Sequence, residues 1–175
     1  MRSSITLLIF SFTHPVNFRR CRMSLLCGEL SRKVLFFMAE TKNKYLAKRW
    51  LMTAEEDLAA AQTLSDHEMF AIACFHAQQA AEKSIKAIWH FEDEDPWGHS
   101  VKKLIDDFPR KDELPDLSEL NDSASLLDKY YIPTRYPNGL PDLTPGQVYT
   151  KSDAALGLDA AYRFIELCKR WMETM

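Results

Sequence analysis

The sequence predicts an all-α protein, an up-and-down bundle of four main helices plus one short helix. Apolar residues recur at steps of three and four along most of the chain from Met38 onward, which is the spacing of one helix face. No stretch alternates apolar and polar residues as a half-buried strand does. From Met38 onward the prolines lie between these periodic segments, where they would end one helix before the next begins.

The first two helices are expected over residues 42–64 and 67–91. In the first, one apolar stripe follows from the spacing of Leu46, Trp50, Ala54, Leu58, Ala61 and Leu64. In the second, small or apolar residues share one face, which predicts close approach of a neighbouring helix: Ala73, Ala77, Ala80, Ala81, Ser84, Ile85 and Ile88. Asp66 is expected to cap the second helix.

Three further segments complete the expected bundle. A short helix is predicted over residues 99–108, after the break at Pro96 and Gly98, and a fourth helix over 117–131. Residues 132–149 contain four prolines and are expected to be non-helical. A loop longer than about 12–15 residues is usually functional or disordered, and its aromatic residues and arginine favour a function here. The last helix should begin near residue 150, where Thr150 and Asp153 have the spacing of a capping box.

Residues 1–37 differ in character from the rest of the chain. Their charged side chains are almost all basic, with Glu29 as the one acid. They show no sustained helical period. We expect residues 38–175 to form the folded domain and residues 1–37 to be an N-terminal extension, disordered or a translated leader. A basic arm that contacts membrane or nucleic acid is the alternative.

Composition excludes several kinds of site. A net charge of −3 and a pI near 6.0 give no global attraction to polyanions, so a phosphate site would need a local cluster of cations. Five glycines form no phosphate-binding loop. No apolar run reaches the ~18 residues of a membrane span, and we expect a cytoplasmic protein without membrane contact. The four cysteines, Cys21, Cys27, Cys74 and Cys168, form no CxxC pair and are expected to be free thiols in a reducing compartment.

Polar residues of the second helix share one side. His76, Gln79, Lys83 and Lys86 are three or four residues apart. Such a row could bind a phosphate chain while Gln79 reads a polar edge. The alternative is a solvated face in which Glu82 and Lys86 form a weak surface pair.

Arg135 is the strongest single candidate for a phosphate contact. Pro133 and Pro137 stiffen its backbone and so reduce the entropy lost when the side chain is fixed. Tyr131 and Tyr136 could stack on a base while the guanidinium binds phosphate. Alternatively, Arg135 pairs with a bundle carboxylate such as Asp57 and holds the loop in place.

The sequence does not predict a metal site. His76 and His99 lie in different helices, with no acidic or thiol pair at ligand spacing. His99 could equally cap its helix or bind a backbone carbonyl. The four tryptophans, Trp50, Trp89, Trp97 and Trp171, are expected to be core and interface residues.

Three segments together resemble the HEPN domain of bacteria and archaea. They are residues 54–61 (AEEDLAAA), residues 73–87 (ACFHAQQAAEKSIKA), and the set of GHS at 98–100, YIPTRYP at 131–137 and YT at 149–150. The resemblance implies a helical bundle that dimerises, with nucleotide binding as its proposed activity. Such proteins are often encoded beside a minimal nucleotidyltransferase, in a toxin–antitoxin-like pair, and many branches of the family are metal-independent ribonucleases.

The ribonuclease branches use an arginine followed a few residues later by a histidine near the last helix. This sequence has no histidine after His99, so Arg135 lacks that partner and no catalytic residue is predicted. The leading hypothesis is a nucleotide-binding or regulatory HEPN subunit, homodimeric, with a nucleotidyltransferase partner and with ATP or another nucleotide as ligand. Its expected ligand site is His76, Gln79, Lys83, Lys86, His99, Tyr131, Arg135 and Tyr136. The alternatives are a ribonuclease that pairs His76 or His99 with Arg135, and a pure protein-interaction module.

Overall fold

The structure, a computed structural model, describes residues 23–113 and 120–174 of the chain. Within these ranges every regular element is helical, which confirms the all-α class. The chain divides into two compact units, Met1–Phe37 and Met38–Met175. The expectation of an extension or leader falls largely on residues 1–22, which lie outside the described ranges.

Helix α1 (Met23–Asp66) is longer than predicted. The first helix was expected to begin near residue 42, and that start is wrong, because the helix already covers residues 23–41. No proline lies between Pro15 and Pro96, so nothing in the backbone chemistry forces a break there. From Lys42 onward α1 buries one alanine at every seventh residue: Ala47, Ala54 and Ala61. Two helical turns separate these alanines, so they mark the face that packs against the bundle.

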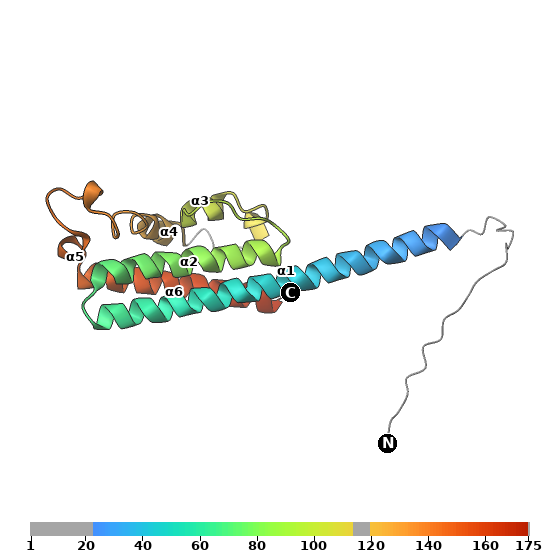
Figure 1. The fold of residues 1–175 in the computed structure, drawn as a ribbon, viewed down its shortest axis with the longest axis horizontal. Coiled ribbons are helices and arrows are strands. Elements are labelled where there is room, and N and C mark those ends of the chain that lie inside the picture. Colours follow the sequence, from blue (N-terminus) through green and yellow to red (C-terminus); the bar gives the residue numbers. More distant parts are fainter. Residues whose placement is uncertain (1–22, 114–119, 175) are drawn as a thin grey trace, which may run out of the picture. The chain divides into compact units, whose positions relative to one another are not determined.

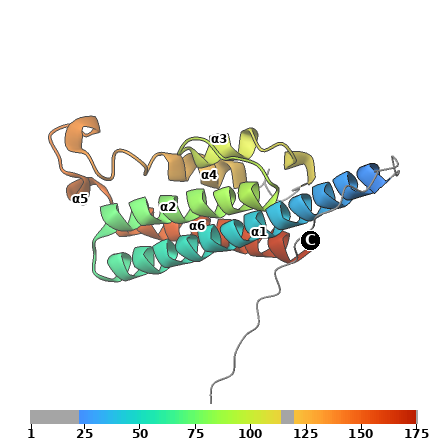
Figure 2. The same ribbon diagram turned by 45° about the vertical axis from the view of Figure 1, so that its right-hand side comes forward.

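Helices α2 (Phe70–Phe91) and α6 (Lys151–Thr174) form the centre of the bundle with α1. Figure 1 and Figure 2 both show the three long helices side by side, with α3 (Val101–Asp106) and α4 (Asn121–Asp128) on the side of α2 away from α1. The small residues predicted to share one face of α2 are all buried. At Gly157 of α6 an added Cβ would lie 3.3 Å from Ala77 Cβ and 3.2 Å from the Tyr130 ring, so α2 and α6 are closely packed.

The start of α2 differs from the prediction. Asp66 is the last residue of α1, and its carboxylate accepts a hydrogen bond from Gln62 Nε2 at 2.8 Å. A turn with Glu68 at a positive φ of 60° separates the helices. Helix α2 begins at Phe70 without a side-chain cap, so the capping role predicted for Asp66 is wrong.

Two segments in the second half of the chain differ from the prediction. The helix expected before residue 132 is shorter, and the segment expected to be non-helical after it contains short helices. Helix α4 covers eight residues, shorter than the predicted 117–131, of which 117–119 lie outside the described ranges. The segment 132–149 contains two short helices, η3 (Pro137–Gly139) and α5 (Pro145–Val148). Each begins with proline, which suits a first helical position because its missing N–H would be unpaired there anyway.

The start of α6 and the burial of two cysteines agree with the sequence, whereas the exposure of one tryptophan does not. Thr150 N donates to Asp153 Oδ2 at 2.8 Å and Asp153 N donates to Thr150 Oγ1 at 3.4 Å, which confirms the capping box of α6. Cys74 and Cys168 are buried free thiols, as predicted. Trp97, expected to be a core or interface residue, is 90% exposed and therefore does not lie in the core. In the described part of the chain no helix is both long and apolar enough to cross a bilayer.

Candidate functional site

Asp57 of α1 contacts two polar side chains of α2. Its Oδ1 lies 3.0 Å from His76 Nδ1, and its Oδ2 accepts a hydrogen bond from Lys83 Nζ. The Asp57 side chain is 13% exposed, so these contacts form in a partly desolvated place, where a charge pair is stronger than in water. Asp57 therefore does not pair with Arg135, and that alternative from the sequence is wrong.

Glu82 organises a second, buried cluster. Its Oε1 accepts a hydrogen bond from Lys86 Nζ at 2.9 Å and lies 3.0 Å from His99 Nδ1. Its Oε2 accepts from Gln78 Nε2 at 3.1 Å and from Gln79 Nε2 at 3.3 Å. Gln78 Nε2 also donates to the backbone carbonyl of His99 at 3.0 Å, so the start of the α3 region is tied to α2.

One interpretation of the sequence was that this side of α2 is a solvated face on which Glu82 and Lys86 form a weak pair. The pair exists, but both residues are buried, at 3% and 8% exposure. Lys86 Nζ also lies 5.7 Å from the centre of the Trp50 ring. This face of α2 is therefore an internal polar network whose charges are matched, and a burial this deep requires such matching.

Arg135 lies in a cluster of aromatic rings. Its guanidinium carbon is 4.6 Å from the ring centre of Phe75, 4.7 Å from that of Tyr131 and 5.2 Å from that of Tyr136. Its Nε donates a hydrogen bond to the backbone carbonyl of Tyr131 at 2.9 Å, which fixes the orientation of the guanidinium group. Arg135 forms no ion pair with a carboxylate of the described residues, and its side chain is exposed. An arginine held by rings and without an acid is ready to bind an anion.

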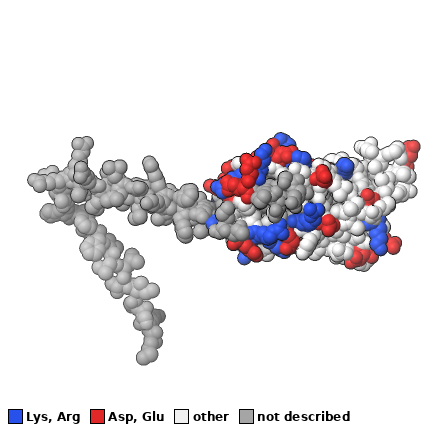
Figure 3. Space-filling view, turned by 180° about the vertical axis from the view of Figure 1, so that it is seen from behind, with Lys and Arg blue, Asp and Glu red and all other residues white. Residues whose placement is uncertain are grey.

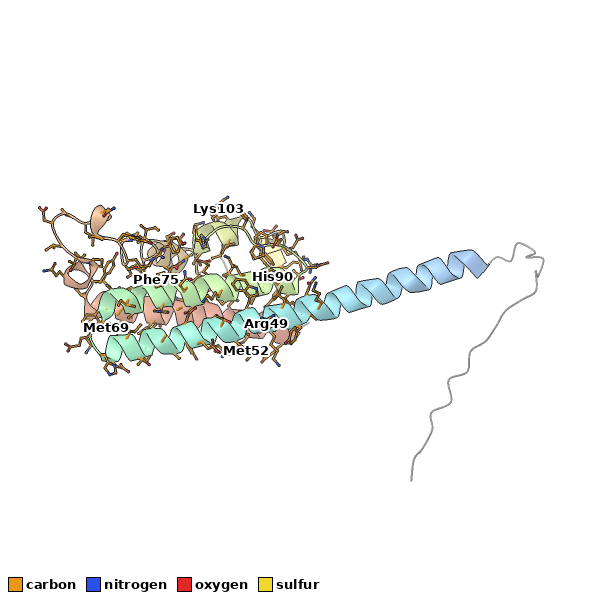
Figure 4. All side chains as sticks on the ribbon, viewed as in Figure 1. Arg49, Met52, Met69, Phe75, His90 and Lys103 are labelled. Atoms are coloured by element: carbon orange, nitrogen blue, oxygen red, sulfur yellow. The ribbon has the colours of Figure 1, made fainter. Side chains whose placement is uncertain are left out.

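A pocket of about 680 Å³ opens beside Arg135. Its wall is mostly apolar and comes from the start of α2, the turn after α4 and the start of α5. It is lined by Glu68, Met69, Phe70, Ala71, Ile72, Phe75, His76, Thr134, Arg135, Pro145 and Gly146. Figure 4 shows Met69 and Phe75 at this end of α2. A pocket with apolar walls and a few polar groups is the usual form of a small-molecule site.

The eight predicted site residues do not form one row of free cations. His76 and Arg135 line the pocket, and Tyr136 lies against Arg135. Tyr131 connects the two regions, because it also stacks on His99 with ring centres 5.0 Å apart. The remaining three, Gln79, Lys83 and Lys86, belong to the two carboxylate clusters and do not line the pocket.

The residues that organise the site were not predicted from the sequence. Glu82 was expected only as a surface partner of Lys86, while Gln78 and Phe75 were given no role. A signal existed for Glu82 and Gln78, since each directly follows a position of the buried alanine face, Ala81 and Ala77. No local signal could have found Phe75 as a contact of Arg135, because sixty residues separate them.

Charged side chains of both signs lie on the face shown in Figure 3. Acidic side chains gather mainly at one upper edge of the described part, a short band of basic side chains crosses its middle, and much of the rest is uncharged. Fold and site together define an all-α helical bundle with an apolar pocket beside an arginine that aromatic rings hold in place.

The comparisons place the chain in a family. Residues 47–171 match the model of the HEPN domain, and the chain belongs to the HEPN domain family. It is similar to TT1696 from Thermus thermophilus, with 37% identity, a TM-score of 0.67 and coverage of 71% of this chain and 96% of that one. It also resembles ST0689, described as an archaeal HEPN homologue, with 30% identity, a TM-score of 0.61 and coverage of 72% and 97%.

A third structure is similar at lower identity. The HEPN domain protein tm0613 from Thermotoga maritima shares 28% identity and a TM-score of 0.57, with coverage of 73% of this chain and 99% of that one. No curated protein matches the chain with significance. Since the relatives are covered almost completely, the shared part is the whole HEPN bundle, which confirms the resemblance stated from the sequence.

Proposed function

We propose that this HEPN chain binds a nucleotide in the pocket beside Arg135 and acts as a regulatory, non-catalytic subunit. The observation that carries the proposal is the position of Arg135, which is held by three aromatic rings at the edge of a 680 Å³ pocket and has no carboxylate partner in the described chain. The arginine fork suits a phosphate group, and an apolar wall suits a flat base.

The pocket has room and chemistry for both parts of a mononucleotide. Phe70, Ile72 and Phe75 offer apolar surface for a base, while His76 offers a second polar contact on the wall. Tyr136 is 50% exposed and can cover a bound base from outside. Lys83 and Lys86 are already matched by carboxylates, so the proposal assigns the phosphate to Arg135 and not to the lysine row.

A calorimetric titration of the full chain with ATP, GTP and a short RNA tests this function. We expect saturable binding of a mononucleotide, lost in Arg135→Ala. Arg163→Ala is the matched control, because Arg163 is exposed on α6 and lies outside the pocket. Unchanged affinity in a folded Arg135→Ala protein, or no binding of any of the three ligands, would refute the proposal.

A second candidate function is ribonuclease activity. It is favoured by one observation, that His76 and Arg135 line the same pocket while Asp57 Oδ1 orients His76 through Nδ1. An oriented imidazole beside an anion-binding arginine is the arrangement that general acid–base cleavage of RNA needs. Digestion of a labelled RNA that His76→Ala abolishes and His67→Ala preserves would support it. Intact RNA after long incubation with pure protein would exclude it.

The proposed partners come from the family resemblance. They are a second copy of the chain and a minimal nucleotidyltransferase, the latter in a toxin–antitoxin-like pair. Co-expression with a nucleotidyltransferase encoded beside this chain should give a complex on gel filtration. If that complex forms equally well with Arg135→Ala and without nucleotide, the chain is a protein-interaction module and the nucleotide proposal is not needed for it.

A further inference from the structure

The outward side of α1 carries an apolar line. Tyr45 is 65% exposed and Met52 is 52% exposed, and Ala59 is exposed as well. These three residues are seven apart, so two helical turns separate each from the next and they project from the same side of α1. Figure 4 labels Met52 on this helix, away from the pocket end marked by Met69.

Charged residues flank this line in a mirrored order. Lys48 and Arg49 precede Met52 by four and three residues, whereas Glu55 and Glu56 follow it by three and four. A helix turns by about 100° per residue, which places Arg49 and Glu56 on one side of the line and Lys48 and Glu55 on the other. Each side of the line therefore carries a cation before Met52 and an anion after it.

This order is complementary to itself when two helices run antiparallel. A two-fold axis through Met52 brings the first half of one α1 against the second half of the other. Arg49 then lies beside Glu56 of the second copy, with a difference in height of about 1.5 Å. Lys48 lies equally close in height to Glu55, but Glu55 already pairs with Lys169 of its own chain at 2.9 Å, so Arg49 and Glu56 are the pair that the arrangement adds. A parallel two-fold arrangement would instead place Arg49 beside Lys48 and Glu56 beside Glu55 of the second copy, and like charges repel.

Shape supports the same arrangement. The two-fold axis brings Tyr45 of the second copy to the height of Ala59, a large residue against a small one. Ala59 borders a groove of about 550 Å³ between α1 and α6, which is also lined by Leu58, Tyr162 and Ile165. Tyr162 is 55% exposed, so its ring is available to a side chain that enters the groove. The groove is also lined by the charged side chains of Glu55, Asp159, Glu166 and Lys169. The exposed Tyr45 side chain suits this mixed lining, because its ring is apolar and its hydroxyl is polar.

We propose that a second copy of this chain docks antiparallel on α1, with Met52 at the two-fold axis, Arg49 paired with Glu56 across it, and Tyr45 in the groove beside Ala59. The surface is isologous, so it closes a dimer and leaves no free copy of itself. The inference gives an interface to the homodimer of the proposed function and rests on that part of it. It is independent of the nucleotide pocket, because none of these residues lines that pocket.

Charge exchange tests the pairing of the two copies. Sedimentation velocity of the full chain over a concentration series should show a dimer, weakened about tenfold or more by either Arg49→Glu or Glu56→Arg. The double variant should regain the dimer, because the exchanged charges are again complementary. An equimolar mixture of the two single variants should also form dimers, since each protein supplies the charge that the other needs.

A cross-link tests the position of the axis. In a background with Cys21→Ser and Cys27→Ser, Met52→Cys should give a disulfide-linked dimer on mild oxidation, because two copies of residue 52 meet at the axis. Met69→Cys, 46% exposed at the start of α2, is the matched control and should stay unlinked. If the dimer is not weakened by either charge variant and Met52→Cys gives no cross-link, the α1 interface is wrong while the homodimer stands. A monomer at all concentrations overturns both.

Discussion

Glu82→Gln removes one charge from the buried cluster while keeping the shape of the side chain. Glu82 is 3% exposed, and four polar atoms surround its carboxylate: Lys86 Nζ, His99 Nδ1, Gln78 Nε2 and Gln79 Nε2. An amide has one acceptor and one NH₂ group, so its NH₂ must face donors on one side. The variant also leaves the Lys86 side chain, which is 11% exposed, without its carboxylate partner. Breaking a buried pair in this way costs about 3–5 kcal/mol of unfolding free energy.

Urea denaturation followed by circular dichroism measures this loss. The matched control is Asp106→Asn, which breaks the exposed pair of Lys102 and Asp106 and should cost about 1 kcal/mol or less. Adding Lys86→Met to Glu82→Gln should then restore part of the stability, because the unpaired ammonium is removed. If Glu82→Gln loses no more stability than Asp106→Asn, the buried network does not carry the energy assigned to it.

The remaining predictions concern packing and pH. Gly157→Leu should lose about 1–3 kcal/mol of unfolding free energy in urea, because its side chain would overpack the α2–α6 contact; Gly139→Leu, with open space around it, should change little. Burial lowers the pKa of His90 below its ordinary 6.5, so the stability of the wild type should fall as pH drops below 6.5, and His90→Gln should flatten that slope in acid titrations. Burial raises the pKa of the Cys74 and Cys168 thiols to about 12, above their ordinary 9.0, so they contribute stability below pH 9 that is lost between pH 9 and 12. A thiol reagent at pH 8 should therefore modify neither thiol in the native protein, and rapid native labelling of either would contradict its burial.

The helices of the bundle could be predicted because their signals are local. The alanine face of α2 and the capping box of Thr150 and Asp153 are set by spacing along the chain, and both are found. The ends of helices were less predictable. Asp66 has the right chemistry for a cap, but Gln62 on the preceding turn already binds its carboxylate. A cap is a competition between partners, and the sequence alone does not show which partner is nearer.

The contacts around Arg135 were easier to predict than those of the polar side chains of α2. Arg135 lies against Tyr131 and Tyr136, which are close to it in sequence. The partners of His76 and Glu82 were not predicted, since Asp57 contacts His76 from another helix and His99 contacts Glu82 from beyond the end of α2. Burial then reverses the expected meaning of Lys86, from a free ligand contact to a matched internal charge.

The pocket is built from two parts of the chain that should exchange amide hydrogens at different rates. Phe75 and His76 lie inside α2, whose face toward α6 is closely packed, so their amides should open only when the whole bundle unfolds. Arg135 lies in a turn followed by short helices and largely exposed residues, where local opening is enough. A ligand in the pocket would thus leave the exchange of α2 almost unchanged and slow that of residues 131–149. The bundle acts as the fixed wall of the site, and the proline-rich segment is the part that would report whether it is occupied.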